Sequence, residues 1–200
     1  MTQPFVDVAF PLRGKTLPLD HGYVLFGAVS RIVQRVHQEP TWGVHPVHGR
    51  RAGPGVLEVL PSSLLTLRVP PSAIGELLPL AGLTFDVGGH SVSLSVPRIF
   101  PLQPRPALRA RFVTVKKFTT EGAEFDEALR RQLDIMGVSK TATITSGPRR
   151  VQRVSNHTIV GFPVALDGLN ADESLLVQTT GLGGRRHMGA GLFLPAGRGD

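Results

Sequence analysis

The chain contains no cysteine, only four lysines and no long run of apolar residues. Without cysteine, disulfides, thiolate metal sites and cysteine nucleophiles are all excluded, and redox arguments leave the compartment open. No apolar run approaches the ~20 residues that a membrane-spanning helix needs, and the N-terminal residues lack the basic and apolar regions of a signal peptide. We therefore expect a cytoplasmic protein with no membrane partner.

Several motifs that identify enzymes are also absent from the sequence. There is no Walker loop, no zinc-ligand spacing, no nucleophile elbow and no Rossmann fingerprint. We therefore expect no cofactor, no metal and no small-molecule substrate.

The residues that are present indicate a folded, basic protein. Hydrophobic residues make up 41% of the 200 residues, which is enough to form a core, and the net charge is +7. Arginine supplies most of the positive charge, and its guanidinium group binds phosphate through two hydrogen bonds. This favours a nucleic-acid partner. High genomic GC content also produces arginine-rich chains, and composition does not separate the two explanations.

The hydrophobic pattern predicts the order strand, helix, two strands, helix, strand in each half of the chain. The proline-rich segment 97–106 between the halves reads as a linker. The predicted fold class is α+β, with two tandem ferredoxin-like (RRM-like, β-α-β-β-α-β) domains at residues 1–100 and 107–200. The first half has strands at 5–10, 56–60 and 64–69, helices at 23–37 and 70–80, and a closing hairpin formed by strands 83–87 and 91–96. The second has strands at 108–118, 140–145, 158–166 and 191–195 with helices at 125–136 and 172–178.

A glycine-rich segment near the end of the chain is the most distinctive feature of the sequence. Residues 181–191 hold five glycines with two arginines and a histidine between them. Such a backbone can approach an anion closely while guanidinium groups clamp it, which suits phosphate. A glycine-rich hairpin at a sheet edge is the alternative. The candidate RNA-binding residues here are Gly183, Gly184, Arg185, Arg186 and His187.

A second basic segment, predicted to be a loop between two strands, holds Arg149, Arg150 and Arg153. These residues could grip an RNA backbone. A solvated basic turn explains them about as well.

The predicted loop from Thr41 to Arg51 holds two histidines, two arginines and the only tryptophan. Histidine acts as acid or base near neutral pH and arginine stabilises a phosphorane, so the set suits metal-free RNA cleavage. The candidate catalytic residues are His45, His48 and, more weakly on spacing, His21. A metal site at His45 and His48 has no carboxylate or cysteine nearby to complete it. His37, His90 and His157 are treated as background.

Three segments together resemble a known family. The segments 19–23, 43–49 and 181–193 are similar to the CRISPR-associated RAMP-superfamily endoribonucleases that process precursor CRISPR RNA, Cas family six, in a type I-like subgroup. The resemblance covers most of the chain and implies tandem ferredoxin-like folds. It implies cleavage within each repeat without metal, a 2′,3′-cyclic phosphate end and a product that often stays bound.

The resemblance also implies site residues and partners. Family members commonly place the catalytic histidine in or near the first helix or the loop after it, which matches His45 best, with His21 and His48 as rivals. No lysine lies between Lys15 and Lys116, so Arg50 or Arg51 would be the basic partner at the cut site. The implied partners are a CRISPR repeat stem-loop and other Cas proteins of a type I effector complex. Some RAMP proteins of this shape bind RNA without cutting, so a non-catalytic RNA-binding subunit is the alternative.

Overall fold

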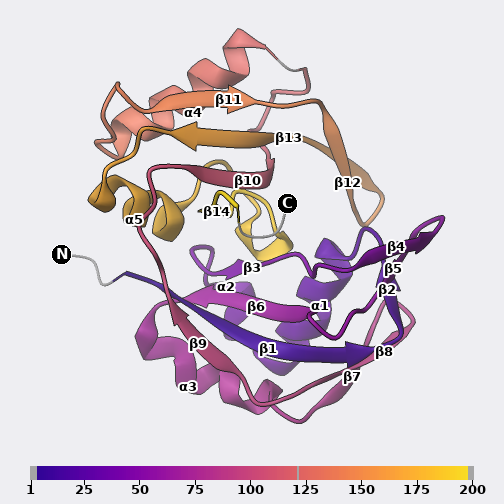
Figure 1. The fold of residues 1–200 in the computed structure, drawn as a ribbon. Coiled ribbons are helices and arrows are strands. Elements are labelled where there is room, and N and C mark those ends of the chain that lie inside the picture. Colours follow the sequence, from indigo (N-terminus) through magenta and orange to yellow (C-terminus); the bar gives the residue numbers. More distant parts are fainter. Residues whose placement is uncertain (1–3, 121, 198–200) are drawn as a thin grey trace. The chain divides into compact units, whose positions relative to one another are not determined.

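The computed structural model describes residues 4–120 and 122–197, and the chain divides into two units. The first unit runs to Pro101 and also includes His187–Gly189, while the second runs from Leu102 to Arg186 and resumes at Ala190 (Figure 1). Among the described residues, no helix has both the length and the apolar character needed to cross a bilayer.

The first unit is built around an antiparallel sheet in which β1 is central. The strand order is β3-β6-β1-β8-β7, and β9 pairs with β1 beside β8. One edge of β1 pairs with β6, whereas the other edge is shared, first by β9 and then by β8. The strands are β1 (Val6–Gly14), β3 (Gly43–Val44), β6 (Leu64–Val69), β7 (Thr84–Val87), β8 (His90–Leu94) and β9 (Arg98–Pro101).

Two sequence expectations about this sheet were wrong. The first strand was expected to stop at Pro11, but β1 continues to Gly14. Pro11 lies where β1 changes partner from β9 to β8, and its carbonyl accepts from Ser95 N at 2.9 Å, so the missing N–H costs no ladder bond there. The expected linker 97–106 contains β9, because its first residues pair with Val6–Ala9.

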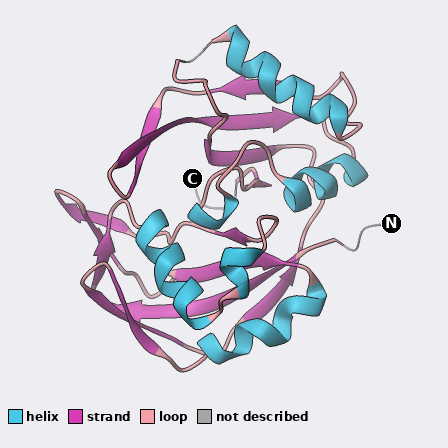
Figure 2. Cartoon of the chain, turned by 180° about the vertical axis from the view of Figure 1, so that it is seen from behind, coloured by secondary structure: helices cyan, strands magenta, loops and turns pink. Residues whose placement is uncertain are grey.

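Helices cover one face of this sheet, as the view from behind in Figure 2 shows. The buried residues of α1 are Leu25, Phe26, Ala28 and Val29, which recur at helical spacing. The expected single helix at 23–37 is divided at Val33 into α1 (Gly22–Ile32) and α2 (Arg35–Gln38). The expected helix at 70–80 is confirmed as α3 (Ile74–Leu77) between two 3₁₀ turns.

A small three-stranded sheet completes the first unit. Its order is β2-β5-β4, formed by β2 (Thr16–Pro18), β4 (Arg50–Gly53) and β5 (Val56–Glu58). Two of the residues expected in a loop, Arg50 and Arg51, therefore lie on a strand that pairs with Glu58 and Leu57.

The second unit has the strand order β11-β13-β10-β14 and two helices. Its core joins Phe125 and Leu129 of α4 and Val177 of α5 to Phe162 and Val164 of β13, so both helices pack on the sheet. Gly137 ends α4 with φ +80°, as its position predicts. The elements are β10 (Leu108–Val113), α4 (Ala123–Ile135), β11 (Thr143–Ser146), β13 (His157–Asp167), α5 (Ala171–Thr180) and β14 (Leu194–Pro195).

The basic segment before β13 is a strand, which corrects the expected loop. Strand β12 (Arg150–Val154) pairs with β13 in a hairpin whose last pair is Val154 and His157. The turn between them is Ser155-Asn156, with Ser155 at φ 54°. Of the predicted basic residues, Arg150 and Arg153 are therefore on a strand, and Arg149 directly precedes it.

Candidate functional site

His21 joins the start of α1 to the histidine-containing loop. The loop folds back so that Val47 N donates to His21 Nε2 at 2.9 Å, while His21 Nδ1 lies 2.9 Å from the Pro18 carbonyl. Because Nε2 accepts a hydrogen bond, the ring proton is on Nδ1 and is donated to Pro18. His21 is 4% exposed. Both ring nitrogens hold the backbone in place, which is a structural role.

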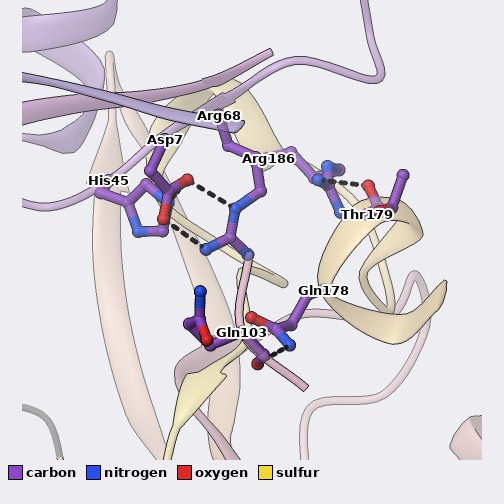
Figure 3. A network of polar contacts seen from close by, with 7 residues as sticks. All are labelled: Asp7, His45, Arg68, Gln103, Gln178, Thr179 and Arg186. Carbon is purple, nitrogen blue, oxygen red and sulfur yellow. Dashed lines mark hydrogen bonds and ion pairs between the residues drawn. The ribbon is translucent and has the colours of Figure 1, made fainter. Parts of the chain in front are cut away.

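His45 is buried beside an ion pair (Figure 3). Its Nε2 lies 3.6 Å from Oδ1 of Asp7, and the buried Arg68 donates to both oxygens of Asp7 at 2.7 and 2.8 Å. Burial alone would raise the pKa of Asp7, but the hydrogen bonds from Arg68 and the nearby imidazole of His45 outweigh it and hold that pKa well below its ordinary value. The carboxylate is therefore charged and shared between two side chains.

The remaining predicted residues of this loop are exposed. His48 is exposed, and its main-chain carbonyl accepts from Ser63 Oγ at 2.6 Å. Arg50 is paired with Glu58 at 2.7 Å. Arg51 is exposed and has no ion-pair partner among the described residues. His48 and Arg51 are thus the members of the predicted set best placed to meet a ligand.

The structure adds a histidine that the sequence reasoning treated as background. The rings of His37 and His187 both lie on Phe26, with centroids 5.7 and 4.4 Å from that of Phe26. His37 is exposed and His187 is half-buried, and all three residues belong to the first unit. The spacing of Phe26 and His37 gives no signal for this contact, because eleven residues of one continuous helix span about 16 Å. The two rings meet because the helix is divided at Val33 into α1 and α2. The contribution of His187 has no local signal either, because it comes from a distant part of the chain.

Most glycines of segment 181–191 serve the packing of the protein itself. Gly183 has φ +72°, and its N–H donates to Gln132 Oε1 at 2.8 Å. A Cβ there would overlap the carbonyl oxygen of Thr114. Gly184 differs, because a Cβ there would meet nothing within 4 Å. Other glycines of the segment with positive φ and close contacts are Gly181, Gly189 and Gly191.

The two neighbouring arginines of this segment have different environments. Arg185 is exposed, with φ 65°. Arg186 is 5% exposed, and its Nη2 donates to the Thr179 carbonyl at 2.8 Å near the end of α5 (Figure 3). A cation at the C-terminus of a helix is favourable, so Arg186 has a structural role in this geometry. Gln178 likewise donates to the Gln103 carbonyl at 2.9 Å.

The β12 hairpin brings arginines close together. Arg150 Nη1 donates to the Arg111 carbonyl at 3.3 Å, and Arg149 Nε donates to the Thr119 carbonyl at 3.3 Å. Burial and the charge of Arg150 both lower the pKa of Arg111. Arg153 is also exposed on this hairpin. Like charges held at this spacing attract a polyanion such as phosphate-bearing RNA.

No group of three or more histidine and carboxylate side chains is placed to hold a metal ion within residues 4–120 and 122–197.

Comparisons with known proteins fit this arrangement. A family model described as Cas6 CRISPR matches residues 6–198. A relative from Myxococcus xanthus (strain DK1622), named CRISPR-associated endonuclease Cas6, is 43% identical over 194 residues, which cover 97% of this chain and 83% of the relative.

Solved structures share the fold at low identity. One, described as a Cas6-related gene product from Pyrococcus furiosus, has a TM-score of 0.65 at 14% identity, covering 97% of this chain and 99% of that one. Another, CRISPR endoribonuclease Cse3 bound to 19 nt RNA, has a TM-score of 0.54 at 15% identity, covering 97% and 98%. The prediction of tandem ferredoxin-like α+β domains is confirmed by these likenesses. The chain belongs to the Cas6 family of CRISPR-associated endonucleases.

Proposed function

We propose that this chain is a CRISPR repeat-specific endoribonuclease that cuts precursor CRISPR RNA without a metal ion and stays bound to its product. The observation that carries this proposal is the pair of imidazoles on Phe26, in a chain that is 43% identical to a named endonuclease. His37 is exposed and its ring nitrogens have no hydrogen-bond partner among the described residues.

The reaction uses a nucleophile that belongs to the RNA. A histidine accepts the proton of the 2′-hydroxyl, the 2′-oxygen bonds to the adjacent phosphorus, and the bond from phosphorus to the 5′-oxygen breaks. A second histidine in its protonated form donates a proton to that 5′-oxygen. The products are a 2′,3′-cyclic phosphate and a free 5′-hydroxyl, so neither metal nor enzyme nucleophile is required.

Accessibility decides between the histidines. A general base must come within hydrogen-bond reach of the 2′-hydroxyl. His37 and His48 are exposed, and His187 is half-buried but shares Phe26 with His37, so these three are the accessible candidates. His45 and His21 were the other predicted bases, and their buried contacts to Asp7 and to the Val47 and Pro18 backbone support positioning roles instead.

RNA binding is assigned to the exposed arginines of the predicted set other than Arg50, which pairs with Glu58. Arg51 in the first unit and Arg185 in the second belong to this set. The exposed arginines of the β12 hairpin, Arg149, Arg150 and Arg153, complete it. The similar fold of the Cse3 protein was solved with a 19 nt RNA, and a repeat stem-loop is the corresponding ligand proposed for this chain.

The test is incubation of labelled CRISPR-repeat RNA with the protein in EDTA, beside an RNA with a single 2′-deoxy at the cut position. We expect cleavage of the first RNA only. His37→Ala and His187→Ala should each reduce the single-turnover rate by at least about 100-fold, with unchanged RNA affinity. Wild-type rates for these two variants and for His48→Ala would contradict catalysis by the accessible histidines.

A non-catalytic RNA-binding subunit of an effector complex is the second candidate. It is favoured by one observation, namely that two of the three predicted catalytic histidines are engaged in buried contacts. Tight, salt-dependent binding of both RNAs with no cleavage of either would establish this alternative.

A further inference from the structure

The second unit contains a hollow of about 690 Å³ beside the glycine-rich segment. It lies between the residues that follow β10, the first residues of β13 and Gly183–Arg185. Thr114 and Gln132 hold the glycine-rich side of the hollow in place. Gly184 N donates to the Thr114 carbonyl at 3.0 Å, and Gly183 N donates to Gln132 Oε1 at 2.8 Å. Hydrogen bonds within the second unit therefore maintain the shape of the hollow.

Backbone strain is concentrated at this hollow. Lys117 and Arg185 have φ of 79° and 65°, and both line it. Ser155, in the β12–β13 turn, is the other described non-glycine residue with positive φ. Residues with side chains rarely adopt this conformation, and such strain collects at ligand sites. A glycine would remove the strain at either position, but it would also remove a cation.

The chemistry of the lining matches a nucleotide. Lys116, Lys117 and Arg185 supply positive charge at the rim, and no carboxylate lines the hollow among the described residues. Val115, Phe118 and Ile159 supply apolar surface within it. Its volume falls in the range of small-molecule sites, ~300–1,000 Å³. A planar base against the apolar surface and a phosphate among the cations would satisfy both parts.

The amide of Gln132 adds a donor that can read a base. Its Oε1 accepts from Gly183 N, which fixes the orientation of the side chain and turns Nε2 away from that bond. No described residue accepts from this Nε2. Carbonyl oxygens and ring nitrogens of nucleobases are suitable acceptors.

We propose that this hollow binds one unpaired nucleotide of the RNA, with its base against Phe118 and its phosphate held by Lys116, Lys117 and Arg185. The inference rests on the RNA binding proposed above and adds a requirement for a single-stranded nucleotide. A double-stranded stem cannot place a base here, because its bases are stacked and paired. A free nucleoside monophosphate shares this chemistry and is the other source that the experiment must separate.

Two variants test the hollow without damage to the fold. Gly184→Leu places a side chain where nothing lies within 4 Å of a Cβ, at a φ that is not positive. Lys117→Gly removes one cation while relieving the strained backbone. For both, we expect an unchanged or higher Tm. The control Lys140→Ala removes an exposed lysine that does not line the hollow.

Binding is measured in EDTA with 2′-deoxy-blocked RNA, so that the result does not depend on cleavage. For repeat RNA with unpaired flanks, we expect Gly184→Leu and Lys117→Gly to raise Kd at least tenfold, and Lys140→Ala less than twofold. For a fully paired stem, all three variants should match the wild type. A 4-thiouridine in the unpaired segment should cross-link to the peptide that contains Phe118.

Three outcomes would overturn the proposal. Equal losses for the paired and unpaired RNAs would make the lysines a general phosphate surface, and wild-type affinity in Gly184→Leu would show that nothing enters the hollow. Tight binding of free UMP or AMP that repeat RNA does not displace would make it a free-nucleotide site. Failure of catalysis leaves these binding measurements valid, so the two proposals fail separately.

Discussion

The polar residues of the two units are used in opposite ways. In the first unit, Asp7, Arg68 and His45 form a group in which the charges are buried and shared. In the second, Lys116 and Lys117 are exposed and have no ion-pair partner among the described residues. Buried charges that are fully paired fix a structure, whereas unpaired exposed cations leave their binding capacity for a ligand. The same residue types therefore indicate stability in one place and recognition in the other.

Removal of Arg68 should give the largest effect on stability. Arg68→Leu leaves the carboxylate of Asp7 without its two main hydrogen bonds, and we expect a loss of about 3–5 kcal/mol in the free energy of unfolding. Urea unfolding followed by tryptophan fluorescence measures this change in the first unit, because Trp42, which is 2% exposed there, is the only tryptophan.

The double variant Asp7→Leu/Arg68→Leu is the matched control. Without an unpaired charge, it should recover much of the stability that Arg68→Leu loses. If Arg68→Leu were as stable as the wild type, the ion pair between Asp7 and Arg68 would not be a stabilising contact.

Protonation of Asp7 at low pH should break the same group of charges. The folded-state pKa of Asp7 is lowered from its ordinary value of 3.8, so its contribution is fully present above that value and is lost as pH falls below it. We expect the free energy of unfolding of the first unit to fall by on the order of 2–3 kcal/mol as the pH is lowered from about 5 to the acid limit of folding. Asp7→Asn should flatten this part of the profile, and identical profiles would contradict the assignment.

Alanine substitutions at two adjacent glycines should differ in their effect on stability, by less than the loss of Arg68. Gly183→Ala should destabilise the second unit by about 1–3 kcal/mol, because its φ is positive and a Cβ would overlap Thr114. Gly184→Ala should stay within about 0.5 kcal/mol of the wild type. Thermal unfolding by circular dichroism measures both, and equal Tm values for the two variants would be evidence against this division of roles.

The smallest effect on stability is expected at two neighbouring arginines of the first unit. Arg50→Ala removes the exposed pair with Glu58 and should cost at most about 1 kcal/mol. Arg51→Ala should cost less, since it removes no ion pair, yet it should weaken RNA binding more. Titrations at several salt concentrations test this, and a steeper loss of affinity for Arg50→Ala would reverse the assignment.

Local patterns predicted much of the fold. Alternating and helical spacing placed the strand at 64–69 and the helix ended by Gly137, since burial of one face decides both. Strand β12 was missed because Arg149, Arg150 and Arg153 gave its sequence the composition of a loop, while its pairing with β13 depends on the Ser155-Asn156 turn.

The site was harder to predict, because sequence proximity does not reveal accessibility. His45 and His48 are close in sequence, yet one is buried beside Asp7 and the other is exposed. Likewise, Arg185 is exposed and its neighbour Arg186 is buried. The contact of His187 with Phe26 joins distant parts of the chain, so no local pattern could predict it.

The inclusion of His187–Gly189 in the first unit has a consequence for biosynthesis. The ribosome completes the residues up to Pro101 well before it reaches this short segment, which at ~5–20 residues per second is a delay on the order of 5–20 seconds. Phe26 therefore lacks its contact with the His187 ring for that interval. If His187 and His37 act together, the nascent chain becomes a nuclease only after His187 has been synthesised and its ring has reached Phe26.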